Sequence, residues 1–129
     1  MRNKKKEYTL EDYMKVGAAF RIYAELFSHM NISQLLNSAK YTDKYLKGRK
    51  LLDLVKSHLD TNLFKDCCKK YEDAGGNGND LCDVFYGGLL RSRNNEIDNK
   101  MHTLMVEKLS EIAEKLGYKL QPSSGKDGD

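Results

Sequence analysis

The chain has 129 residues, with 22 lysines and arginines against 19 aspartates and glutamates, for a net charge of +3. This length suits one domain with its own hydrophobic core. No apolar run reaches the roughly 18 residues of a membrane span, and the basic N-terminus lacks the apolar part of a secretory signal, so we expect a cytoplasmic protein that does not enter the membrane.

Cysteines and histidines do not follow a metal-site pattern. The three cysteines include an adjacent pair, Cys67 and Cys68, and no C-x-x-C, while the three histidines are widely spaced. An odd cysteine count argues against a disulfide scaffold. Nucleophile-elbow, zinc-protease and dinucleotide motifs are missing as well. We therefore expect no metal, no cofactor and no enzymatic activity, and small buried cysteines.

Charge is divided unevenly along the chain. Residues 1–65 carry 13 basic and 7 acidic side chains, net +6, whereas residues 66–129 carry 9 and 12, net −3. The basic excess comes from an N-terminal arm and from the stretch between Lys40 and Lys50. Either segment can contact an anionic partner.

The first expected helix starts at Thr9, whose hydroxyl can cap the amide of Asp12, and ends near Met30. Its middle, VGAAFRIYAELF, is apolar around most of its circumference, with Arg21 and Glu25 one turn apart as an expected surface pair. Such a helix lies either at the centre of a bundle or in a dimer interface. We favour the central position, and a monomer and a homodimer through helix 9–30 both stay open.

Residues 31–60 follow a helix-turn-helix pattern, although the spacing also fits any two packed helices. Asn31 or Ser33 can cap a short helix, and Thr42 can cap a longer one. On the longer helix, lysines three or four residues apart line one face, while Leu46, Leu51, Val55 and Leu59 are expected to point elsewhere. The predicted nucleic-acid-binding residues are Lys40, Tyr41, Lys44, Lys47, Arg49 and Lys50, joined by the arm residues Lys4, Lys5 and Lys6.

A third core-facing helix is expected from Asn62 and ends at the glycine-rich segment DAGGNGND, residues 73–80. Compared with a calcium loop, this segment has Gly75 at the third position and Val84 at the twelfth, so decisive oxygen ligands are missing. Its aspartates would repel a phosphate. It is expected to be a flexible connector in which glycines supply positive φ.

Two more helices complete the expected fold. Asp80 can cap one in which Gly87 and Gly88 favour a bend or an early end. The last runs from about Asn95 to Leu116, with Gly117 as its C-terminal stop and Tyr118 packing back onto it.

The sequence thus predicts an all-α, single-domain bundle of five or six helices. Residues 1–8 form a basic flexible arm, 9–118 the helical domain and 119–129 a disordered tail. The predicted function is that of a non-catalytic regulatory protein whose basic face contacts an anionic partner, with nucleic acid as the first choice. Eight tyrosines and five methionines favour the alternative, a protein-interaction module such as an inhibitor, an immunity-like protein or an adaptor.

Overall fold

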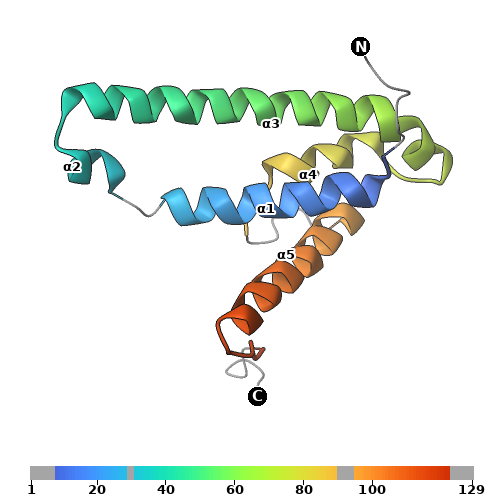
Figure 1. Ribbon diagram of the computed structural model, residues 1–129. Helices are drawn as coiled ribbons and strands as arrows, with labels where there is room; N and C mark the ends of the chain where they lie inside the picture. The colour runs from blue at the N-terminus through green and yellow to red at the C-terminus, as the bar shows by residue number, and fades with distance from the viewer. Residues whose placement is uncertain (1–7, 29–30, 90–94, 123–129) are drawn as a thin grey trace, which may run out of the picture.

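The computed structural model describes residues 8–28, 31–89 and 95–122, and the arm residues Lys4, Lys5 and Lys6 lie outside these ranges, as do residues 123–129. All regular structure in the described residues is helical, which confirms the all-α class. The elements are α1 (Leu10–Ser28), α2 (Ile32–Leu36), α3 (Ala39–Asp73), a 3-10 helix η1 (Gly78–Cys82), α4 (Asp83–Tyr86) and α5 (Glu96–Lys115) (Figure 1).

Helix α1 begins with the predicted cap. The Thr9 hydroxyl accepts a hydrogen bond from the amide of Asp12 at 3.1 Å, and the amide of Thr9 donates to the Asp12 carboxylate at 2.9 Å. This reciprocal pair satisfies two amides that the first turn leaves open. The helix then contacts α3, α4 and α5, which is the central position expected from its apolar circumference.

Two small residues of α1 pack against other parts of the same chain. Ala18 is fully buried, and a Cβ built on Gly17 would lie 2.4 Å from the backbone oxygen of Val84. Helix α4 therefore approaches α1 more closely than any side chain at position 17 would allow. At Gly17, α1 is thus covered by α4 of the same chain.

Helix α3 differs from the prediction, because one continuous helix of 35 residues replaces two. It starts earlier than Thr42: the Ser38 hydroxyl caps it by accepting from the amide of Tyr41 at 3.4 Å. It also passes through Asn62 without a break, since no glycine or proline occurs between Arg49 and Asp73. At 1.5 Å per residue the helix is about 52 Å long, and it runs antiparallel to α1 (Figure 1).

Only the C-terminal half of α3 contributes to the core. Its buried residues are Leu63 and Cys67. Figure 1 shows η1 and α4 beneath this half, while α2 and the C-terminal part of α1 follow the N-terminal half. Leu51 and Leu54 are 64% and 66% exposed. The N-terminal half of α3 is therefore a largely uncovered helix with apolar side chains on its surface.

The glycine-rich segment packs against the end of α3. Gly75 has a φ of +100°, and Gly78 is buried so closely that a Cβ there would meet the side chains of Cys68 and Glu72. The N-cap of η1 is Asn77, whose side chain accepts from the amide of Asn79 at 3.0 Å. The prediction that Asp80 caps this helix was wrong, because the turn starts three residues earlier.

Helices α4 and α5 end as their glycines predict. Helix α4 stops before Gly87, and Gly117 follows α5 with a φ of +91°. The N-cap of α5 is Asn95, which accepts from the amide of Asp98 at 2.8 Å. The ring of Tyr118 is mostly exposed, so its predicted packing onto α5 was wrong. No helix in the described part of the chain is long and apolar enough to cross a membrane.

Candidate interaction surface

Three of the predicted binding residues form a line on α3. At about 100° per residue, Lys44 lies about 40° from Lys40 on one side and Lys47 about 20° on the other. The buried residues Leu63 and Cys67 lie about 140° and 180° from Lys40. We call Lys40, Lys44 and Lys47 the lysine line. It faces away from the core, and all three side chains are exposed.

The structure separates the remaining predicted residues of α3 from this line. Arg49 lies about 180° from Lys40 around the helix axis. Closer to the C-terminal end of α3, residues on this same side face the core. The Arg49 guanidinium donates to the hydroxyl of Tyr45 at 3.1 Å, and this bond raises the pKa of Arg49. Lys50 lies about 80° to one side and Tyr41 about 100° to the other. Of the six residues predicted for one basic face of α3, only the three lysines of the lysine line therefore share a face.

Local contacts on the lysine line are weak. Lys47 pairs with Asp43 at 3.2 Å, but both side chains are more than half exposed, and such a pair is worth little in water. The Lys40 ammonium lies 5.6 Å from the centre of the Tyr41 ring. Both lysines can therefore turn toward a partner at small energetic cost.

Two leucines continue the line. Leu51 and Leu54 lie about 20° and 40° from the direction of Lys40, so the same face is basic over its first turns and apolar over the next. The expectation that Leu51 points away from the lysines was wrong. Counting the spacing past Lys47 would have shown it, since 40, 44, 47, 51 and 54 are successively four and three residues apart.

Of the predicted helix-turn-helix pattern, the structure shows a five-residue helix, α2, joined to α3 by a sharp turn. Helix α2 has five residues, none of them buried, and the corner to α3 is made by Asn37 with a φ of +47°. Ser38 is occupied as a helix cap and Tyr45 as the acceptor for Arg49. These two polar side chains thus have structural partners within the chain.

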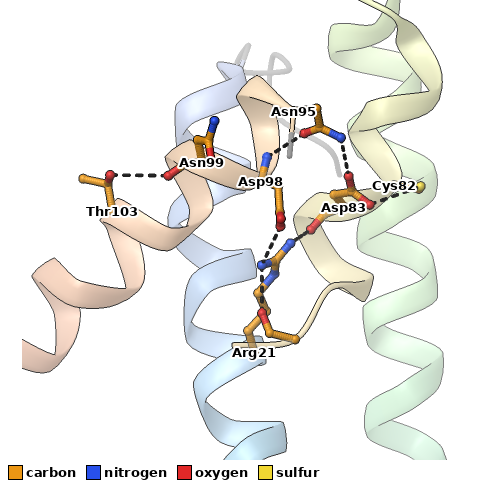
Figure 2. A network of polar contacts seen from close by, with 8 residues as sticks. Arg21, Cys82, Asp83, Asn95, Asp98, Asn99 and Thr103 are labelled. Carbon is orange, nitrogen blue, oxygen red and sulfur yellow. Dashed lines mark hydrogen bonds and ion pairs between the residues drawn. The ribbon is translucent and has the colours of Figure 1, made fainter. Parts of the chain in front are cut away.

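A buried polar cluster, which the sequence did not predict, joins α1, α4 and α5 (Figure 2). The Arg21 guanidinium donates to the backbone oxygens of Asp83 and, at 2.9 Å, Gly88, and it lies 3.4 Å from the Asp98 carboxylate. Asn95 donates to the Asp83 carboxylate at 2.9 Å. The expectation of Arg21 as a surface residue paired with Glu25 was wrong, because its side chain is 1% exposed.

This cluster has the properties of a structural site. Burial lowers the pKa of Arg21, and the neighbouring carboxylates of Asp98 and Asp83 oppose that effect. A Cβ at Gly87 would lie 2.2 Å from the guanidinium, so a side chain at position 87 would displace Arg21 from its partners.

Metal and thiol chemistry find little support in the described residues. No group of three or more histidine, cysteine, aspartate or glutamate side chains is placed there to hold a metal ion. Cys67 is buried and Cys68 half-buried, and desolvation raises the pKa of both thiols. A raised thiol pKa opposes formation of the reactive thiolate.

No protein-family model matches this chain, and neither a curated protein nor a solved structure matches it.

Proposed function

We propose that the protein is a non-catalytic binding protein that contacts an anionic partner through the lysine line of α3, with a nucleic-acid backbone as the first candidate. The observation that carries this proposal is the alignment of Lys40, Lys44 and Lys47 within about 60° on the side of α3 opposite the core. Aligned lysines neutralise phosphates and release counterions.

The width of the line limits the binding that we expect. Three phosphate contacts correspond to a slope of about −3 in the logarithm of the binding constant against the logarithm of salt concentration. Backbone contacts of this kind carry no sequence information. The proposed binding is therefore sequence-independent, weak at physiological salt and strongly salt-sensitive.

An acidic protein surface is the second candidate, and Leu51 and Leu54 favour it. Both leucines lie in line with the lysines and are about two-thirds exposed. A phosphate backbone offers no apolar group to these side chains, whereas a protein partner can cover them.

Lys44→Glu and Arg49→Glu form a matched pair for the test. The two substitutions change the charge equally, on opposite sides of one helix. We expect duplex and single-stranded DNA of random sequence to bind the wild type at low salt, and Lys44→Glu to weaken binding and flatten the salt slope by about one unit. Arg49→Glu should have the smaller effect.

Two results would contradict the nucleic-acid candidate. An equal loss in both variants would mean that net charge, and not the line, attracts DNA. If DNA does not bind even at low salt, the acidic protein surface becomes the better candidate, and Leu51→Asp is then the variant to compare in partner binding.

A further inference from the structure

Two tyrosines border the lysine line on the N-terminal half of α3. At about 100° per residue, Tyr41 and Tyr45 lie about 100° and 140° from Lys40, beyond Lys44 at about 40°. One helical turn separates the two tyrosines, so their rings project from the same side of the helix. Tyr41 is 53% exposed, and Tyr45 is half-buried. Aromatic rings thus stand directly beside the cations on this half of α3.

A cation accompanies each of the two rings. The Lys40 ammonium lies 5.6 Å from the centre of the Tyr41 ring. The Arg49 guanidinium lies 5.9 Å from the centre of the Tyr45 ring and donates to its hydroxyl. Exposed cation–π contacts are weak, so Lys40 can leave Tyr41 for a phosphate at small cost. Arg49 has two contacts with Tyr45 and therefore holds that ring in place.

Gly48 leaves the surface next to the rings open. It lies about 80° from Lys40, between Lys44 and Tyr45 around the helix, and a Cβ built on it has no atom of the described residues within 4 Å. Helix α2 approaches α3 from another side. The space at their junction is lined, on α3, by residues about 60° to 160° from Lys40 in the direction away from the tyrosines, namely Ala39, Thr42, Asp43 and Leu46. Helix α2 therefore leaves the rings accessible.

Charge on this side of the segment has one sign. From Lys40 to Leu52 the one acidic residue is Asp43, which lies about 60° from Lys40 on the side away from the tyrosines. The sector of the helix from the lysine line through Tyr41 to Arg49 thus carries cations and rings and no carboxylate of this segment. An anionic chain can follow the sector without repulsion from its own support.

Rings beside cations are the combination that binds single-stranded nucleic acid. Its phosphates pair with lysines, while its unpaired bases stack on aromatic side chains. In a duplex the bases are stacked on one another, so a surface of this kind meets only the backbone. The rings therefore add to the binding of a single strand and not to that of a duplex.

We propose that the lysine line binds single-stranded nucleic acid in preference to duplex, with unpaired bases stacked on Tyr41 and Tyr45 beside the open surface at Gly48. This proposal rests on the proposed function of the lysine line and names the class of nucleic acid. Tyr41 contributes more than Tyr45, because its ring is the more exposed. Every base has a face that can stack, so the preference is for unpaired strands and not for a sequence.

Three labelled probes of about 16 nucleotides separate stacking from charge. They are a single-stranded oligothymidylate, a duplex of random sequence, and an abasic strand that keeps the phosphates without the bases. Fluorescence anisotropy at low salt measures their binding to the full chain. We expect Tyr41→Ala to weaken binding of the single strand about tenfold at an unchanged salt slope, and binding of the other two probes less than about twofold. Lys44→Glu should weaken all three and flatten the slope.

Tyr41→Phe and Tyr118→Ala are the controls. Phenylalanine keeps a ring on which a base can stack. Tyr118 is 74% exposed and follows α5, so its loss removes a tyrosine of similar exposure away from α3. Both variants should bind the single strand within about twofold of the wild type. Circular dichroism of each variant establishes that it is folded.

Three results would overturn the proposal while the lysine line keeps its function, provided that Lys44→Glu still weakens binding. The first is an equal loss of single strand and duplex in Tyr41→Ala. The second is equal affinity of the wild type for the single strand and the abasic strand. The third is equal affinity of Tyr41→Ala and the wild type for the single strand. If none of the probes binds at low salt, the nucleic-acid candidate and this proposal are both wrong.

Discussion

Replacing Arg21 by methionine measures how much the buried cluster stabilises the junction of α1, α4 and α5. The Arg21 and Asp98 side chains are 1% and 2% exposed. Methionine fills much of the same space but removes the donors to Asp83 and Gly88, and it leaves Asp98 buried without Arg21. Removing one partner of a buried ion pair destabilises a protein by about 3–5 kcal/mol, so we expect a loss in this range.

Urea unfolding followed by circular dichroism tests this expectation. With a slope of about 2 kcal/mol per molar urea, the midpoint should fall by about 2 M. Arg49→Met, at an exposed arginine of α3, is the control and should change stability by less than about 0.5 kcal/mol. A loss below about 1 kcal/mol would refute the reasoning.

Two further predictions concern stability. Gly17→Ala should destabilise by about 1–3 kcal/mol because its Cβ would lie 2.4 Å from the oxygen of Val84, whereas Gly48→Ala, on an open helix surface, should stabilise by about 1 kcal/mol; equal shifts in thermal unfolding would contradict the close approach of α4. Desolvation raises the pKa of Asp60, so its carboxylate disfavours the folded state at neutral pH and ceases to do so below the ordinary aspartate range. Asp60→Asn should therefore raise the urea midpoint at a pH of about 7 and change it little at about 3, and an equal gain at both would argue against a desolvated carboxylate.

Local signals in the sequence predicted the ends of several helices. Thr9 and Asn95 have hydroxyl or amide oxygens that cap amides within three residues, and Gly87 and Gly117 follow the last turns of α4 and α5. These caps and stops depend only on residues that are close in sequence, so short segments are enough to predict them. The all-α class follows from the same helical spacing.

Long-range contacts explain what the sequence could not show. Arg21 reads as a surface residue because its partners Asp83 and Asp98 are 62 and 77 residues away. The unbroken α3 was missed for a different reason: no glycine or proline between Arg49 and Asp73 ends the helix, so the break predicted before Asn62 had no local signal. For the candidate surface, the lysine line was predicted, whereas the displacement of Arg49 needed only stricter counting around the helix.

The C-terminal half of α3 is packed against the core and the N-terminal half is largely exposed, so the two halves should tolerate substitutions differently. After Leu59, a substitution on the inner side of the helix disturbs Leu63 or Cys67 and lowers thermal stability. Before Leu59, the exposed side chains contribute little to stability, so a substitution there can abolish the proposed binding while the melting temperature stays constant. In a mutational scan of α3, variants that fail to accumulate and variants that accumulate without function should therefore separate near the middle of this one helix.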